Sequence, residues 1–242
     1  MANKSDSKAL DRLVESLRTA HGDNLASIIL YGSAAAGDDV ERTSDHNLLV
    51  ALNRISADDL RVSHHALRDW NKLGEPMPVY FTVEELKRAA DVFPIEFMQM
   101  ERARKVLFGR DAFEFLFISP ANLRHQTEYE LRTKLLQLRR LYIPASVSVE
   151  KLLALMTDSL ASFAALFRAV LSLNGQQAPM TTAETVHATV SLFELEAFPF
   201  DEILKLRTKT TSRMSDEEAT EVFSAYMAQI ERVIQAVDKT DS

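Results

Sequence analysis

The chain of 242 residues contains no cysteine, few glycines and no long uninterrupted apolar run. Without cysteine it has no disulfide, no thiolate metal site and no cysteine nucleophile, as suits a reducing compartment. The N-terminal residues lack the apolar core of a signal peptide. The most apolar stretch, residues 152–173, is interrupted by Asp158 and Arg168, which favours a buried helix over a membrane span. We therefore expect a soluble, cytoplasmic protein.

The chain also lacks an excess of basic residues. Its formal net charge is −7, divided almost evenly between residues 1–120 (−4) and 121–242 (−3). Neither half has the positive charge typical of a nucleic-acid-binding domain, so we do not expect such a partner. Apolar residues make up 46% of the chain, enough for the core of one large or two modest domains.

Two of the six glycines fall in one short stretch, Leu30 to Gly37. An apolar strand, Ser27 to Tyr31, leads directly into Gly32 and Ser33. Glycine allows a backbone to approach phosphate closely, and a serine hydroxyl with neighbouring N–H groups can bond phosphate oxygens. The same dipeptide is also common in ordinary turns, so its meaning depends on the residues that come after it in the chain.

A second apolar strand, Asn47 to Leu52, begins after a spacer of eleven residues and is preceded by Asp45. Residues two apart in a strand point to the same side, so Asp45 and Asn47 are expected to share one site. Two carboxylates at such positions would hold Mg²⁺ against a triphosphate. Asn47 keeps an oxygen ligand but removes one negative charge, which favours a weakened or inactive metal site. His46 is expected to point away and to be structural.

The segment from Leu30 to Val50 resembles the DNA-polymerase-β-like nucleotidyltransferase superfamily. The layout, with a small N-terminal α/β domain and a helical second half, is similar to bacterial nucleotidyltransferases related to kanamycin nucleotidyltransferase. The resemblance implies that Gly32 and Ser33 hold the β- and γ-phosphates of an NTP. It also implies that Asp45 holds Mg²⁺, with Asn47 as a weak second ligand.

Members of this superfamily also carry a third carboxylate on a later strand, and here the sequence departs from the family pattern. The corresponding strand here, Met77 to Thr82, has none. Glu75 precedes it, while Glu84 and Glu85 come after it at a helix start. If a nucleotide is transferred to a hydroxyl group, Glu75 is the best available candidate for the base that removes the proton of that hydroxyl.

The order of predicted elements indicates an α+β protein: a small mixed β-sheet nucleotidyltransferase domain over residues 1–118, then an all-α helical bundle over 119–242. We expect the helices of the first domain to cover one side of the sheet, and Gly109 to Asp111 to open a short helix. Five helices are predicted after Ser119-Pro120, where serine caps and proline occupies the first turn.

Two functions remain open from the sequence. The first is Mg²⁺-dependent transfer of a nucleoside monophosphate from an NTP to a hydroxyl of a small molecule or protein. The second is an inactive module that binds a nucleotide or a protein and acts as a sensor, a scaffold or an antitoxin-like protein. Such a module could form a homo-oligomer or engage a protein partner through the helical domain. The first helix of the bundle carries five basic residues, Arg124, Arg132, Lys134, Arg139 and Arg140. They either contact a triphosphate or an acidic partner, or form a solvated face paired with Glu128 and Glu130.

Overall fold

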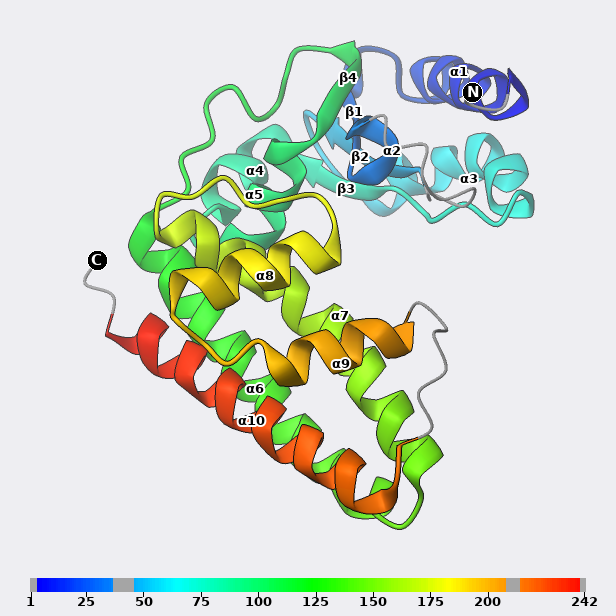
Figure 1. Ribbon diagram of the computed structural model, residues 1–242. Helices are drawn as coiled ribbons and strands as arrows, with labels where there is room; N and C mark the ends of the chain where they lie inside the picture. The colour runs from blue at the N-terminus through cyan, green and yellow to red at the C-terminus, as the bar shows by residue number, and fades with distance from the viewer. Residues whose placement is uncertain (1–3, 37–45, 208–213, 240–242) are drawn as a thin grey trace. The chain divides into compact units, whose positions relative to one another are not determined.

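The computed structural model describes residues 4–36, 46–207 and 214–239. The chain divides into two compact units, Met1–Ser119 and Pro120–Ser242. The first contains the sheet and the second is helical (Figure 1). The predicted α+β class, with a small mixed sheet followed by an all-α part, is confirmed.

The sheet of the first unit has four strands in the order β3-β2-β1-β4. The central strand β1 (Leu25–Tyr31) pairs antiparallel with β2 (Asn47–Leu52) and with the edge strand β4 (Arg104–Gly109). Strand β3 (Val79–Thr82) runs parallel to β2. The register places Asn47 opposite Tyr31 and Tyr31 opposite Arg104. Three strands therefore meet at the end of β1, directly before Gly32.

Helices cover both faces of this sheet, which corrects the expectation of one covered side. Helices α1 (Lys4–His21) and α3 (Ala57–Lys72) pack on one face, through residues such as Leu17 and Trp70. Helices α4 (Val83–Ala89) and α5 (Pro94–Arg102) pack on the other, through Leu86 and Phe97 (Figure 1). The reason is visible in β1 and β2, whose side chains are nearly all apolar and buried, so neither face tolerates water.

Short elements connect these layers. A 3-10 turn (Gly22–Asn24) leads into β1, and a four-residue helix α2 (Ser33–Ala36) comes after that strand. Ser56 and Thr82 begin α3 and α4 with capping boxes closed by Asp59 and Glu85. The short helix predicted from Gly109 is wrong, because Gly109 ends β4 and residues 112–115 form a turn.

The second unit consists, within the described residues, of five helices. They are α6 (Pro120–Ala145), α7 (Val149–Leu173), α8 (Thr182–Leu192), α9 (Phe198–Arg207) and α10 (Asp216–Asp238). Helix α7 is long and apolar enough to cross a membrane by length and composition alone. In the structure it is the core of the bundle, because α6, α8, α9 and α10 all pack against it. The prediction of a buried helix over this stretch is confirmed.

Candidate functional site

Gly32 forms the turn between the central strand and α2. Its φ of +84° lies in the left-handed region that glycine adopts without strain. The Gly32 N–H donates to the carbonyl of Ala103, 2.9 Å away, and the Gly32 carbonyl accepts from Ala35 N–H at 3.0 Å. The backbone bond to Ala103 ties this turn to the segment before β4. The turn is thus a fixed feature of the sheet end.

Asn47 stands beside this glycine. It opens β2 opposite Tyr31, and a Cβ atom placed on Gly32 would lie 3.5 Å from the Asn47 amide nitrogen. The side chain is partly exposed. It belongs to the same face of the sheet as Leu49 and Ala51, which pack toward α4 and α5. The structure therefore brings together two of the predicted site residues, Gly32 and Asn47.

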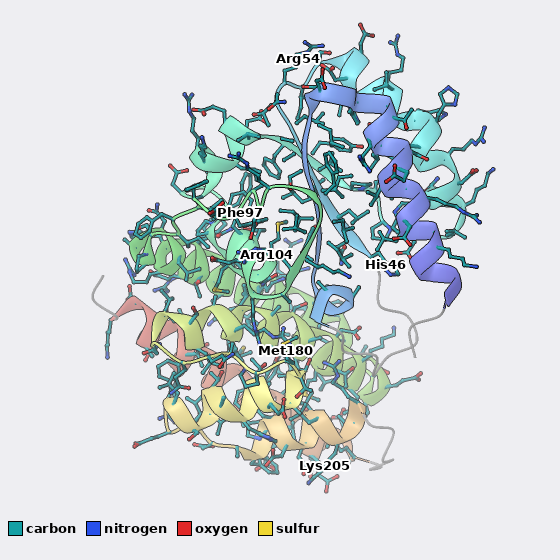
Figure 2. The ribbon with its side chains drawn as sticks, turned by 90° about the horizontal axis from the view of Figure 1, so that it is seen from above. His46, Arg54, Phe97, Arg104, Met180 and Lys205 are labelled. Carbon is teal, nitrogen blue, oxygen red and sulfur yellow. The ribbon has the colours of Figure 1, made fainter. Side chains whose placement is uncertain are left out.

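His46 faces the opposite layer, as the strand alternation predicts. Its backbone N–H donates to Glu75 Oε2 at 2.8 Å, and its Nδ1 lies 2.8 Å from Glu75 Oε1. The ring of His46, which is labelled in Figure 2, also packs edge-on against Trp70. The indole N–H of Trp70 donates to the carbonyl of Pro76. His46 and Glu75 are each 19% exposed at the side chain. This arrangement fixes the first residues of β2 against α3 and the loop after it.

The carboxylates considered as a third ligand have other partners. Both oxygens of Glu75 bond to His46. Glu85 Oε2 accepts from the Thr82 N–H at 2.7 Å, and Glu84 pairs with Arg88 at 3.0 Å. Among the described residues, no group of three or more histidines and carboxylates could hold a metal ion.

The donor set that remains fits a metal ion only in part. Asn47, whose amide nitrogen is the atom nearest to Gly32, also carries an amide oxygen that is a hard metal donor. Asp45, two residues before it in the chain, lies outside the described residues. Mg²⁺ is often held by one or two protein oxygens, with phosphates and water completing its shell. The residues present suit an ion that arrives with a triphosphate better than a resident one. Ser33 begins α2, and its side chain is also outside the described part.

Three of the basic residues on α6 form ion pairs with carboxylates of the same unit, as the second of the two interpretations predicts. Arg124 pairs with Glu128 at 3.1 Å and Arg132 with the same carboxylate at 2.8 Å. Arg139 pairs with Glu231 of α10 at 2.6 Å. Hydrogen bonding from Arg132, the largest effect, together with the charges of both arginines lowers the pKa of Glu128. Arg140 has no ion-pair partner within the described ranges.

Two contacts at the site were missed by sequence reasoning. Glu75 and His46 are 29 residues apart, and Gly32 and Ala103 are 71 apart in the chain. No local spacing or periodicity links either pair, because each depends on how strands and loops pack. Only the alternation of β2, which turns His46 away from Asn47, was accessible beforehand.

No protein-family model matches the sequence, and no curated protein matches it. Among solved structures, the chain is similar to the spectinomycin adenyltransferase AAD(9) from Enterococcus faecialis, determined with ATP and spectinomycin. The match covers 96% of this chain and 99% of that one, with a TM-score of 0.58 and 13% sequence identity. The chain shares the overall fold of that adenyltransferase. At this identity the likeness concerns the fold, and function rests on the site.

Proposed function

We propose that the protein binds a nucleoside triphosphate at the Gly32 turn and transfers its nucleoside monophosphate to a hydroxyl of a small molecule. The observation that carries the proposal is the closeness of the Gly32 turn to Asn47, at the start of β2, in a fold shared with an adenyltransferase. Residues 1–118 are the nucleotide-handling domain and 119–242 the helical domain of a cytoplasmic protein. The similar adenyltransferase structure contains ATP and a small molecule, which makes ATP the first nucleotide to test.

In this proposal the Gly32-Ser33 turn receives the β- and γ-phosphates. Asp45 and Asn47 would be the protein ligands of a Mg²⁺ ion, which would neutralise phosphate charge when bound. The acceptor hydroxyl gives its proton to water and its oxygen bonds to the α-phosphorus. The bond from that phosphorus to the oxygen bridging to the β-phosphate breaks, and pyrophosphate leaves. Glu75 is a poor choice for the base, because both of its oxygens bond to His46. With one carboxylate in place of two, we expect slow transfer.

A second function is nucleotide binding without chemistry. It is favoured by the absence of a carboxylate from the described strand β3 and by the engagement of Glu75, Glu84 and Glu85 elsewhere. Such a module would sense a nucleotide or present a surface to a protein. It differs from the first function in one measurable way, because nucleotide binding would not require Mg²⁺.

The two functions are separated by calorimetric titration of ATP and then of the other NTPs, with Mg²⁺ and then with EDTA. Transfer predicts Mg²⁺-dependent binding that Asp45→Ala abolishes and that Asn47→Asp strengthens at least tenfold, because the second carboxylate returns. Glu84→Gln is the control and leaves the affinity unchanged. Binding that ignores EDTA supports the sensor, and no binding at millimolar nucleotide contradicts both.

A productive acceptor is sought with the Asn47→Asp variant, which is expected to have the higher rate. Pyrophosphate release is measured with ATP, Mg²⁺ and panels of small hydroxyl compounds. Release that depends on both the acceptor and Asp45 supports transfer. Mg²⁺-dependent binding without release for any acceptor in both the natural chain and the variant would favour the sensor.

A further inference from the structure

Helix α6 is apolar on two opposite sides, although only one of them faces the bundle. Its buried side, including Leu131, Leu135 and Leu138, packs against α7 and α10. On the other side Tyr129, Leu136 and Ile143 are 66%, 59% and 73% exposed. A helix that only closes a bundle is expected to be polar on its outer face. The outer face of α6 is therefore built for contact with another surface.

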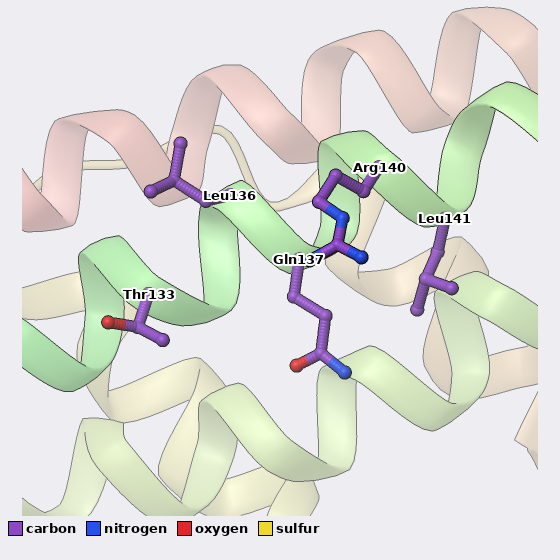
Figure 3. Close-up of a pocket in the computed structure, with 5 residues that line it drawn as sticks. All are labelled: Thr133, Leu136, Gln137, Arg140 and Leu141. Carbon is purple, nitrogen blue, oxygen red and sulfur yellow. The ribbon is translucent and has the colours of Figure 1, made fainter.

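The spacing on this face indicates the kind of surface. Tyr129, Thr133, Leu136, Arg140 and Ile143 follow one another at intervals of four, three, four and three residues. Intervals averaging 3.5 residues make the seam along which one α-helix packs against another. We name these five residues the α6 seam. Figure 3 shows three of them, Thr133, Leu136 and Arg140, projecting from α6 with Gln137 and Leu141 around a hollow in its surface.

Arg140, within the seam, and Glu130, beside it, have no ion-pair partner in the described part of the chain. They are ten residues apart on one helix, so they cannot reach each other. In an antiparallel pair of α6 helices centred on residue 135, Arg140 lies level with Glu130 of the partner subunit. By the two-fold symmetry Glu130 lies level with Arg140 of the partner subunit. The one register thus provides two equal ion pairs.

The same register also matches apolar and polar side chains. Tyr129 lies level with Leu141 of the partner subunit, which is 46% exposed in one chain. Thr133 lies level with Gln137 of the partner subunit, and Leu136 packs close to its own copy across the axis. On the other flank Arg132 and Arg139 are already neutralised by Glu128 and Glu231. No uncompensated repulsion between these arginines opposes the pairing.

We propose that the α6 seam is the interface of a homodimer, in which two copies of α6 pack antiparallel with Glu130 and Arg140 paired across it. The seam runs over residues 129–143, fourteen helical steps or about 21 Å of helix. A pair of this length covers on the order of 600 Å² of each partner, below the roughly 800 Å² of a standard interface. We expect a reversible dimer with a Kd in the micromolar range. The inference is independent of the nucleotide site.

The dimer is tested by sedimentation equilibrium of the full chain from about 1 μM to about 100 μM. The mass is expected to rise with concentration from 27.3 kDa to twice that value. Leu136→Asp, at the centre of the seam, is expected to raise the Kd at least tenfold. Leu73→Asp, also at an exposed leucine but far from α6 in sequence, is the matched control and leaves the mass unchanged. A monomer at every concentration overturns the proposal, and so does a dimer that tolerates Leu136→Asp.

The charge pairs give a test that loss of folding cannot imitate. Arg140→Glu places carboxylates opposite each other, and Glu130→Arg places two cations there, so each change alone weakens the dimer. The double variant exchanges the charges and restores both pairs. A double variant that dimerises no better than the single ones contradicts this register.

The absence of cysteine allows the orientation to be measured directly. In the antiparallel pair, the two copies of position 133 lie about 6 Å apart along the helix axes, and those of position 143 about 24 Å apart. A short bismaleimide is therefore expected to join the subunits of Thr133→Cys and not those of Ile143→Cys. Efficient cross-linking of both would mean parallel helices and overturn the proposal.

Discussion

The two units differ in the kind of group that they bury. The sheet unit buries a titratable side chain, His21, and a polar chain in which the Tyr80 hydroxyl donates to Ser63 and Ser63 Oγ lies 2.8 Å from His21 Nε2. The helical unit buries a cluster of rings, in which Phe167 packs against both Phe163 and Phe200. A buried histidine can gain a charge within the ordinary pH range, whereas these phenylalanine rings cannot.

The difference also extends to the aromatic residue at the centre of the helical unit. Tyr226 is fully buried, contacts Phe163 and Phe200 edge-on, and lies 3.3 Å from Ser159 Oγ through its hydroxyl. Burial raises the pKa of its hydroxyl far above its usual range, so it stays neutral at every physiological pH. The single tryptophan, Trp70, lies in the sheet unit and reports on it alone. Trp70 is therefore a probe of the sheet unit.

The largest expected effect is in the ring cluster. Phe167→Ala removes a fully buried ring that contacts two others, and should destabilise the protein by about 3–5 kcal/mol. Urea unfolding followed by far-UV circular dichroism, which is dominated by the helices, measures the loss. Phe198→Ala is the control, because Phe198 is 52% exposed in the same unit. A loss below about 1 kcal/mol would mean that the cluster is not tightly packed.

Two glycines of the sheet unit distinguish backbone strain from steric contact. Gly109 and Gly74 have similar φ values, +76° and +81°. A Cβ on Gly109 would clash with the Ala26 carbonyl oxygen, whereas one on Gly74 meets nothing within 4 Å. Gly74→Ala should cost about 1 kcal/mol from conformation alone, and Gly109→Ala at least about 2 kcal/mol, because β4 must move away from β1.

The measurement for this pair is the urea midpoint of Trp70 fluorescence. The difference between the two variants, rather than either value, isolates the contact with Ala26. Equal costs would show that β4 separates from the central strand without penalty.

The Glu75 contact is expected to have a smaller effect. Glu75→Gln replaces a carboxylate that accepts from His46 by an amide, and should cost about 1–2 kcal/mol. Because His46 packs on Trp70, the native emission spectrum should change as well. Glu84→Gln, an exposed residue of the same unit, serves as control for both readouts. An unchanged spectrum together with unchanged stability would remove the role assigned to this contact in fixing β2.

The smallest effect concerns pH. Burial, opposed by the nearby charge of Asp59, lowers the pKa of His21 below the 6.5 of an unfolded histidine. Below about pH 6.5 the unfolded chain therefore binds a proton that the folded sheet unit does not, and stability falls as the pH falls. Above that value this histidine adds no pH dependence.

Urea midpoints of Trp70 fluorescence between about pH 8 and about pH 5 test this expectation. The acid-side slope should be smaller in His21→Asn and unchanged in His64→Asn, where the histidine is exposed. A slope that is the same in both variants would assign the acid sensitivity to other groups.

The sequence alone predicted a large part of the architecture, since that part depends on local signals. Thr82 and Ser215 begin helices with the capping boxes that their spacing indicates, and Ser56 caps α3 as its position before two acidic residues indicates. Helix α7 ends where the apolar stretch of residues 152–173 ends and begins three residues before it. The strands before Gly32 and after Asp45 were identified from apolar runs, and the alternation of β2 placed His46 opposite to Asn47.

The tertiary structure decided which of these residues meet. From the sequence, Glu75 was a candidate for the catalytic base. The structure shows instead that it bonds to His46, because the loop after α3 packs beside β2. The second covered face of the sheet, the bond from Gly32 to Ala103 and the outward position of the α6 seam are likewise contacts between distant segments. Periodicity reports which side of an element is apolar. The group that covers that side depends on the packing of the whole chain, and on the outer face of α6 it depends on a second chain.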